Sequence, residues 1–516
     1  MQWVSEGRAR WAIWLSCAML VGVSVSLFAW YWPGALPEDN ASGVWTALAQ
    51  DFAHGVFYRP PADAFGFGGT RYMPLFFMLH AALIRYACDP VTAGVVLTLL
   101  SILLLDVGTF VALRELGLDR SLALPLALLP HAAVAFQVLS VQIKGDFLAA
   151  ACVMWGTAGA LRYQRRPGNI VLAAVIIAFF AAFLTKFTAF ASGLIVCVCL
   201  YTGGRRRAAI VLMTMLAGLA ALASFVIGAA SDGRWFTSFA AVAGGGSRLI
   251  YALAAPIWLL HSALQDPVFI AIVVVAALYA GVRLVHGPRG FVERYFAGTA
   301  LLTLAIFASP GTDWNHLLDL LGASALVLGA TLVDRPADVR KIAFLPAGVA
   351  AVTFVSLLPG MVSVKSVIER NGKPERWQVG AIAARLGGGA HEVLSEDPIV
   401  PVVLGERPVV LDPFNLRLLA ARRPEVAASF EQRMDTHRFG AVILVDYSAS
   451  DRFHLPHALA ACAASNGAPC YGGVVFPAGF LRELERDYVL SFIERPFVVY
   501  TPRPMTISLS TGAARP

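Results

Sequence analysis

The stretch that decides the fold runs from Pro37 to Tyr86 and reads PEDNASGVWTALAQDFAHGVFYRPPADAFGFGGTRYMPLFFMLHAALIRY. It follows a long apolar run, so its opening carboxylates, Glu38 and Asp39, are expected at the water edge of a membrane. Apolar residues at near-helical spacing predict a helix over about Ala41–His54 that lies flat on the membrane. The second apolar segment, which ends near Tyr86, is too short to span a bilayer.

The composition of the 516-residue chain is that of a polytopic membrane protein. It is 58% hydrophobic and only 14% charged, with a mean hydropathy of +0.68. Its apolar runs approach the ~20 residues that cross a hydrocarbon core, which excludes an ordinary soluble protein. The formal charge of +7 gathers in short loops, so it indicates membrane orientation and not nucleic-acid binding. No Cys/His cluster has the spacing of a zinc site.

The positions of the arginine-rich loops decide how many segments cross the membrane. Keeping these loops on the cytoplasmic side requires about eleven spans, with the segments at about 74–87 and 250–264 re-entrant or on the surface. If either segment crossed, arginine-rich loops would face the periplasm. The predicted spans cover about 11–32, 91–112, 119–140, 146–163, 169–185, 188–204, 207–230, 267–285, 294–309, 315–333 and 342–360.

From about residue 361 the composition becomes that of a soluble domain. Short strands are predicted at Glu392–Glu396, Pro408–Leu411, Ala441–Val445 and Phe497–Tyr500, with helical patterns around Leu416–Ala421, Glu425–Arg438 and Leu455–Ala464. We therefore expect a membrane module over 1–360, whose first periplasmic loop covers about 33–90, and a periplasmic α/β domain over 361–516. No glycine fingerprint for a nucleotide follows a strand.

Three further motifs are predicted on the same face of the membrane as Asp39. They are Lys144-Gly145-Asp146, Leu184-Thr185-Lys186 and the run GTDWNHLL at 311–318. With the order of elements in the first loop, they resemble the GT-C glycosyltransferases that use polyprenyl-phosphate sugars. The protein O-mannosyltransferases and the bacterial aminoarabinose lipid A transferases are the most similar in this pattern, over residues 11–333.

The resemblance implies a GT-C-like helical membrane fold and a glycosyltransferase in a bacterial inner membrane. The donor would be a polyprenyl-phosphate sugar, and the acceptor a periplasmic lipid, glycan or protein. The N-terminus would be cytoplasmic and the C-terminal domain periplasmic.

Sugar transfer needs a base for the acceptor hydroxyl and cations for the departing phosphate. The resemblance favours Asp39 as the base, with Glu38 and Asp146 as further candidates. The other candidates are donor-phosphate contacts at Lys186, Arg71 and His316, and residues of the substrate cleft at Tyr58, Tyr72, Asp313 and Asn315. Relatives differ in their use of a divalent metal, so a metal ion held by Asp39 and Asp146 is also open.

Each charged candidate also has a purely structural explanation. Asp39 can cap the helix that starts near Ala41. Asp146 can form an interfacial pair with a neighbouring lysine, and Lys186 can be a solvated residue at a hairpin tip.

Two other functions compete with glycosyl transfer. A glycolipid transporter or flippase would distribute polar residues through the membrane midplane, whereas nearly all candidate charges here lie on one face. Asp106 is the exception, because it falls within a predicted span. A non-catalytic protein of envelope assembly is compatible with the same pattern.

Two cysteines of the outer domain could pair. Cys462 and Cys470 flank a segment with Asn466, Gly467 and Pro469, which can turn the chain back. Since a periplasmic domain lies in an oxidising compartment, we expect a disulfide between them.

The charge distribution predicts the side of the membrane on which two loops lie. A reporter fused after residue 365 should be periplasmic, and one fused after residue 166 should be cytoplasmic, because Arg162, Arg165 and Arg166 then face the cytoplasm. Paired alkaline phosphatase and green fluorescent protein fusions measure this. A periplasmic signal at residue 166 would contradict both re-entrant assignments.

Overall fold

The computed structural model describes residues 2–334 and 374–503, apart from gaps at 33, 38, 87–88, 243–248, 287–289, 310–311, 313, 388–391, 437, 446–475 and 478. Several predicted features therefore lie outside the described residues. They are Glu38, Asp313, the cysteine pair Cys462 and Cys470, the span at 342–360 and the helix around Leu455–Ala464.

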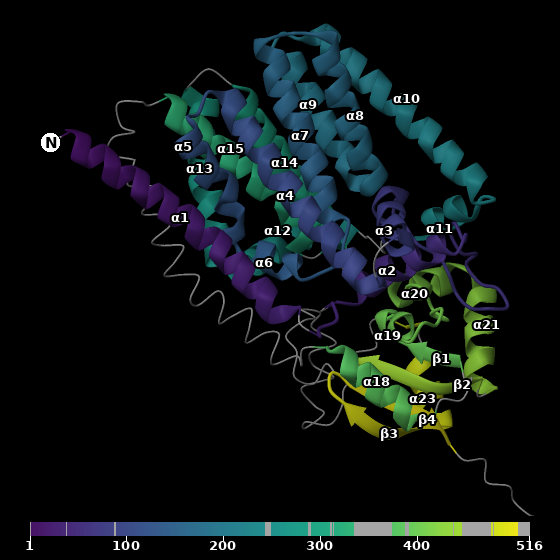
Figure 1. Ribbon diagram of the computed structural model, residues 1–516. Helices are drawn as coiled ribbons and strands as arrows, with labels where there is room; N and C mark the ends of the chain where they lie inside the picture. The colour runs from purple at the N-terminus through teal and green to yellow at the C-terminus, as the bar shows by residue number, and fades with distance from the viewer. Residues whose placement is uncertain are drawn as a thin grey trace, which may run out of the picture.

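The described residues up to 334 form a helical bundle (Figure 1). Its α-helices are α1 (Gln2–Tyr31), α2 (Asn40–Ala53), α3 (Pro74–Tyr86), α4 (Pro90–Leu116), α5 (Arg120–Leu128), α6 (Val134–Ser140), α7 (Asp146–Arg165), α8 (Asn169–Thr185), α9 (Phe190–Thr202), α10 (Arg206–Ala230), α11 (Arg234–Val242), α12 (Leu249–Leu264), α13 (Pro267–His286), α14 (Phe291–Ile306) and α15 (Leu318–Asp334). Short 3-10 turns occur at η1 (Leu129–Ala132), η2 (Phe187–Ala189) and η3 (Trp314–Leu317).

Most of the predicted spans coincide with one of these helices, but the predicted number of about eleven crossings stays a prediction. In the part of the chain that the structure describes, four helices are long and apolar enough to cross a membrane, or five if one bent pair counts as a span. Several others, including α8, α9 and α12, are apolar but shorter. The two segments predicted as re-entrant, α3 and α12, are both in this shorter class.

The predicted span at 119–140 is not one continuous helix. The chain bends by 77° between residues 120–132 and α6. Pro130 lies at the start of η1 and has no N–H to donate, and Ala133 takes an extended conformation (φ −75°, ψ 134°). A proline and one extended residue therefore break the helix that hydrophobicity alone predicts.

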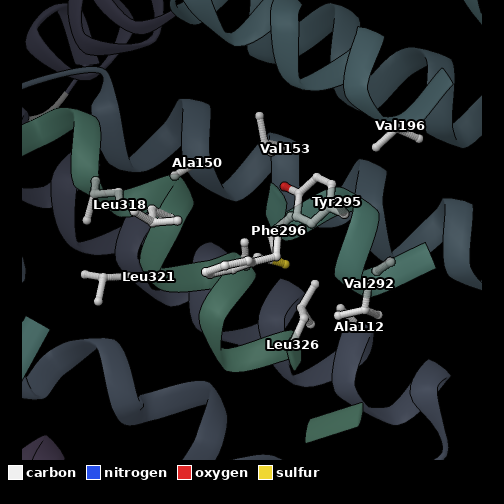
Figure 2. Packing of buried hydrophobic residues seen from close by; sticks show 14 of the residues in the cluster. Ala112, Ala150, Val153, Val196, Val292, Tyr295, Phe296, Leu318, Leu321 and Leu326 are labelled. Carbon is white, nitrogen blue, oxygen red and sulfur yellow. The ribbon is translucent and has the colours of Figure 1, made fainter. Parts of the chain in front are cut away.

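The bundle has a close-packed apolar core (Figure 2). Val153, Phe296, Leu321 and Leu326 are buried in it, from three different helices. Other large apolar side chains point outward, and Phe225 on α10 is 69% exposed. Helices that are apolar on all sides in this way are suited to a lipid environment, with only their inner faces packed against protein.

The described part of the C-terminal region contains a four-stranded sheet of order β1-β2-β4-β3. Its strands are β1 (Glu392–Ser395), β2 (Phe439–Val445), β3 (Tyr488–Glu494) and β4 (Phe497–Pro502), and its helices are α18 (Arg376–Arg385), α19 (Ile399–Val403), α20 (Pro413–Arg422), α21 (Pro424–Asp435) and α23 (Phe480–Asp487). β1 and β2 are parallel, and the other pairs are antiparallel. This confirms a predicted α/β architecture, while the boundary at 360–361 lies outside the described residues.

Three of the four predicted strands are present, and one is wrong. Pro408–Leu411 does not join the sheet. Instead, Val410 forms an isolated bridge with Phe67 of the first loop. The edge strand β3, with the sequence YVLSFIE, was not predicted.

The first loop packs onto the C-terminal region, and α2, α3 and α11 lie between the bundle and the sheet (Figure 1). Phe67 is fully buried and its ring lies 5.6 Å from that of Phe430. Its N–H donates to the carbonyl of Val409 at 2.7 Å. Gly66 is required here because a Cβ at that position would overlap the same carbonyl.

A buried ion pair between Arg59 and Asp51 holds the part of this loop that follows α2. The Arg59 guanidinium donates to both carboxylate oxygens of Asp51, at 2.5 and 2.9 Å, and to the carbonyl of Pro408 at 2.5 Å. Both charged side chains are almost fully buried, with 5% and 7% exposed. Arg407, which is 37% exposed, adds a second contact to Asp51 at 3.1 Å. The pair thus joins α2, the loop and the C-terminal region.

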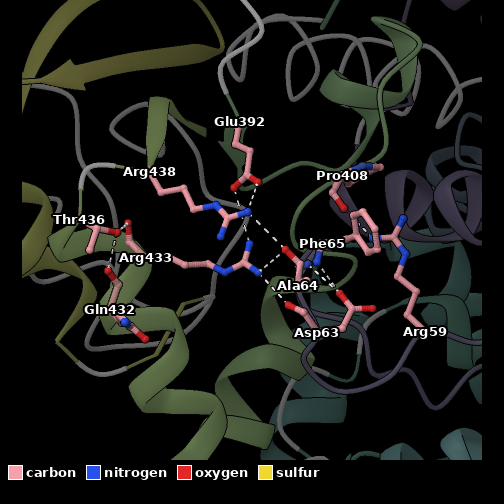
Figure 3. Close-up of polar contacts among 11 residues, drawn as sticks. Arg59, Asp63, Ala64, Phe65, Glu392, Pro408, Gln432, Arg433, Thr436 and Arg438 are labelled. Atoms are coloured by element: carbon pink, nitrogen blue, oxygen red, sulfur yellow. Dashed lines mark hydrogen bonds and ion pairs between the residues drawn. The ribbon is translucent and has the colours of Figure 1, made fainter.

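Two more arginines hold the middle of the loop (Figure 3). Arg433 donates to the carbonyls of Asp63 and Ala64, at 2.7 and 3.0 Å. Arg438 donates to Glu392 at 2.8 Å, and Glu392 also lies 3.6 Å from Arg433. The loop is therefore bound to the C-terminal region along its length and is not a free lid.

The Arg59 pair gives a stability prediction. Arg59→Ala should lower the free energy of unfolding by about 3–5 kcal/mol, because it leaves a buried carboxylate at Asp51. Arg407→Ala is the matched control and should cost less than about 1 kcal/mol, because Arg407 is partly solvated and the bidentate pair survives. Denaturant unfolding of the purified variants measures both. Equal losses for the two variants would contradict the assignment.

Candidate active site

Asp39 lies at the start of α2, where it makes two kinds of contact. One carboxylate oxygen accepts hydrogen bonds from the backbone N–H and the hydroxyl of Ser42, both at 2.9 Å. The other lies 2.6 Å from the ammonium of Lys144. Asp39 is thus the helix cap that the sequence allowed, but its side chain is still 24% exposed and can meet a ligand.

Lys144 and Asp146 stand on either side of Gly145, at the entry to α7. The Ser42 hydroxyl accepts a hydrogen bond from the N–H of Ile143 at 2.9 Å, which ties this entry to α2. A Cβ on Gly145 would press on Trp45, Phe76 and Thr185 at 3.2–3.3 Å, so a side chain would push α7 away.

Asp146 forms the second lysine–carboxylate pair. Its Oδ1 meets the ammonium of Lys186 and accepts a hydrogen bond from the Asn315 amide at 2.9 Å. Lys186 separates α8 from η2 in an extended conformation, so the predicted break between two apolar helices is present. The ring of His316 lies 3.3 Å from the same ammonium.

These residues line a polar pocket at one end of the bundle. The pocket is bounded by the starts of α7 and α15, by the end of α14 and by the residues that follow Lys186. Asp146, Lys186, Asn315 and His316 are all in its wall. The structure thus brings four sequence-predicted residues from three distant motifs to one place.

The two tyrosines of the first loop lie in different surroundings. The Tyr58 side chain is buried, and its hydroxyl donates to the carbonyl of Tyr72 at 2.9 Å, so it supports the loop. Tyr72 stacks on Trp45 with ring centroids 4.3 Å apart. Its hydroxyl is within electrostatic range of both Asp39 and Asp146, and burial raises the pKa of Tyr72.

Arg71 lies where the first loop meets the C-terminal region. Its guanidinium is 5.8 Å from the ring centroid of Phe414, and that of Arg417 is 5.0 Å from the same ring. Arg71 is also within electrostatic range of His316 and of Asp412, the capping residue of α20. Arg71 therefore links His316 electrostatically with a charged residue of the C-terminal region.

Sequence reasoning missed Asp319, Asp412, Phe414 and Arg417. Asp319 follows His316 by three residues and lies in the pocket wall, but an acid there also reads as part of the first turn of a helix. Asp412 precedes a proline, a pattern typical of a helix N-terminus that carries no functional signal. Their functional position depends on long-range folding.

The described residues do not supply a metal-ligand set. Among them, no three His, Cys, Asp or Glu side chains come close enough to hold an ion. The two expected ligands, Asp39 and Asp146, each meet a lysine instead. A cation between them would have to displace both lysines.

Asp412 gives a pH-dependent prediction. Burial raises the pKa of Asp412 to about 6, and contacts with Asn415 oppose this shift. The folded state therefore binds the proton more tightly than the unfolded chain, so stability is greatest below pH ~4 and falls as the pH rises through ~6. Asp412→Asn keeps the helix cap and removes this loss, which amounts to at most about 3 kcal/mol. Unfolding midpoints of both proteins from pH 4 to 7 should diverge, whereas a constant difference would contradict the prediction.

Sequence comparisons find no relatives, but structure comparisons do. No protein-family model and no curated protein matches the sequence. The crystal structure of ArnT from Cupriavidus metallidurans bound to undecaprenyl phosphate has a TM-score of 0.52 and 13% identity, over 96% of this chain and 97% of that chain.

The oligosaccharyltransferase of Archaeoglobus fulgidus is similar as well. Its apo form has a TM-score of 0.58 and 11% identity, over 99% of this chain and 76% of that chain. Its complex with Zn and sulfate has a TM-score of 0.57 and 11% identity, over 96% and 74%. At these identities the likeness concerns the fold: the chain shares the fold of ArnT and of the oligosaccharyltransferase, which agrees with the GT-C-like fold expected from the motifs.

Proposed function

We propose that this chain is a membrane glycosyltransferase that transfers a sugar from a polyprenyl-phosphate carrier to an acceptor hydroxyl at the periplasmic side of a bacterial inner membrane. The observation that carries this proposal is the pair of adjacent lysine–carboxylate contacts, Asp39–Lys144 and Asp146–Lys186. They bring acids and cations together beside a polar pocket at the end of an apolar bundle. The ArnT structure with the same fold is bound to undecaprenyl phosphate, which supports a carrier of this class.

In the proposed reaction Asp39 accepts the proton of the acceptor hydroxyl. The acceptor oxygen bonds to the anomeric carbon as the bond from that carbon to the phosphate oxygen breaks. The electron pair of the broken bond leaves with the polyprenyl phosphate. Asp39 suits the role of base better than Asp146, because 24% of its side chain is exposed against 7% for Asp146.

Lys186 would bind the phosphate of the carrier. It lies at the edge of the pocket, with 24% of its side chain exposed, between two apolar helices along which a lipid chain can run. An arriving phosphate would compete with Asp146 for the ammonium, and Arg71 and His316 are close enough to share its charge.

Asp106, the acid that would have favoured a transporter, has a side-chain partner in the structure. Asp106 lies 3.0 Å from the ring of His131, which also lies 2.8 Å from the hydroxyl of Ser24. This contact joins α1, α4 and η1, and a satisfied helix contact accounts for it. We therefore favour transfer over transport.

Asp39→Asn separates the catalytic and structural roles of this residue. The single oxygen of an asparagine can still cap α2, but its amide then presents N–H groups to Lys144, and it cannot take up a proton. Turnover with a polyprenyl-phosphate sugar should fall by ~10²–10⁴, while the protein stays folded and donor binding stays near wild type.

Ser42→Ala is the matched control for this experiment. It removes the hydroxyl partner of the Asp39 carboxylate and leaves the carboxylate in place. It should cost stability but keep most of the activity. Wild-type turnover in Asp39→Asn would leave Asp39 as a cap only and move the search for the base to Asp146 or Glu38.

Lys186→Ala should weaken donor binding. A charge-assisted contact to phosphate contributes about 1.5–3 kcal/mol, so the dissociation constant for undecaprenyl phosphate should rise about 10- to 150-fold. Lys186→Arg keeps the charge with a different geometry and should show a smaller loss. Unchanged affinity in Lys186→Ala, measured by a binding titration in nanodiscs, would contradict the role.

A further inference from the structure

The pocket beside Lys186 continues into the bundle beyond the proposed phosphate contacts. Its deeper wall includes Thr299 and Thr303 on α14 and Asp319 on α15. Thr299 lies two helical turns from the end of α14, so polar groups extend roughly 10 Å along that helix. An acid among buried helices is costly unless it has a partner, so Asp319 in particular needs an explanation.

Two polar groups of this pocket, Asp319 and the side-chain oxygen of Asn315, have no hydrogen-bond partner in the part of the chain that the structure describes. Among the described residues, Asp319 makes neither a hydrogen bond nor an ion pair. The side-chain oxygen of Asn315 is buried without a hydrogen bond to any described residue. The hydroxyl of Thr299, a residue that is 1% exposed, is within reach of the Tyr295 hydroxyl only, among the side chains that the structure describes. Asn315 uses its amide N–H on Asp146, so its oxygen is left to accept. A carboxylate, an amide oxygen and a hydroxyl thus converge on one space.

These groups specify the chemistry of a ligand. A carboxylate and an amide oxygen only accept hydrogen bonds, so the ligand must present several donors. The ammonium of Lys186 is in the wall of the same pocket and disfavours a metal cation there. A neutral group with several hydroxyls satisfies all three, and both oxygens of a carboxylate can accept from neighbouring hydroxyls at once.

We infer that Asp319, Asn315 and Thr299 form the subsite for the transferred sugar and that Asp319 is its specificity-determining residue. This inference rests on the proposed function, because the sugar enters the pocket attached to a carrier phosphate at Lys186. Asp319 is in the first turn of α15, directly after the η3 residues that meet Lys186. The pocket has a volume of about 20 Å³ in this state, so Lys186 must separate from Asp146 before phosphate and sugar can occupy adjacent parts of it.

The test compares carriers with and without a sugar. Binding of undecaprenyl phosphate and of undecaprenyl phosphate bearing glucose, mannose or arabinose is measured with protein in nanodiscs. Asp319→Ala should weaken the preferred sugar-bearing carrier by about 10- to 100-fold, the range of a hydrogen-bonded charged group. It should leave the bare carrier unchanged, and that unchanged binding also reports that the variant is folded.

Three further variants sharpen the comparison. Asp319→Asn keeps the shape and one acceptor oxygen, so it should retain part of the sugar preference. Thr299→Val is nearly isosteric and should weaken only the sugar-bearing carrier, by a smaller factor. Ser324→Ala is the matched control, because Ser324 is on the same helix, bonds only to the Leu320 carbonyl and is not in the pocket wall. It should leave both carriers unchanged.

The other outcomes overturn the inference in distinguishable ways. If Asp319→Ala weakens the binding of both carriers equally, Asp319 only supports Lys186. If it weakens the binding of neither carrier, the pocket binds water and not the sugar. Stabilisation of the wild type by Mg²⁺ alone, absent in Asp319→Ala, would indicate a cation site. If the wild type binds none of the carriers, the proposed function itself fails and the subsite fails with it.

Discussion

The position of the first loop depends on the guanidinium of Arg59. It is buried between the carboxylate of Asp51 and the carbonyl of Pro408, and each of these groups would be costly to bury alone. The geometry is satisfied only when α2, the loop and the C-terminal region meet in one arrangement. Because Arg433 and Phe67 hold the middle of the same loop, its far end delivers Arg71 and Tyr72 to the site in a fixed position.

The buried charges of the site are likewise tolerated because each lies beside a charge of opposite sign. Lys144 and Asp146 are separated by a single glycine, and each meets a partner of opposite charge from another element. Positive and negative groups thus alternate from Asp39 to Lys186, and none of the four is buried without compensation. A phosphate that enters such an arrangement exchanges one anion for another at Lys186. The site is therefore prepared for an anionic ligand without carrying a net uncompensated charge before it binds.

The sequence predicted the features that depend on local chemistry. The end of α8 at Lys186, the cap at Asp39 and most helix boundaries follow from apolar runs and from polar residues that interrupt them. Two contacts of the segment Pro408–Leu411 could not be found in this way: the bridge from Val410 to Phe67 and the hydrogen bond from Arg59 to the Pro408 carbonyl. In both, more than three hundred residues separate the partners. Asp319 was missed for another reason. An acid is favourable in the first turn of any helix, so its presence there does not indicate a pocket.

The C-terminal region meets the first loop at Arg71, next to the site. Asp412 caps α20, and the ring of Phe414 in the first turn of this helix lies 5.8 Å from the guanidinium of Arg71 and 5.0 Å from that of Arg417. Arg71 comes from the first loop, so this cluster forms only after the loop has packed on the C-terminal region. Electrostatic range connects Arg71 onward to His316, which lies beside Lys186. Arg71 therefore connects the charged residues of the bundle electrostatically with those of the C-terminal region.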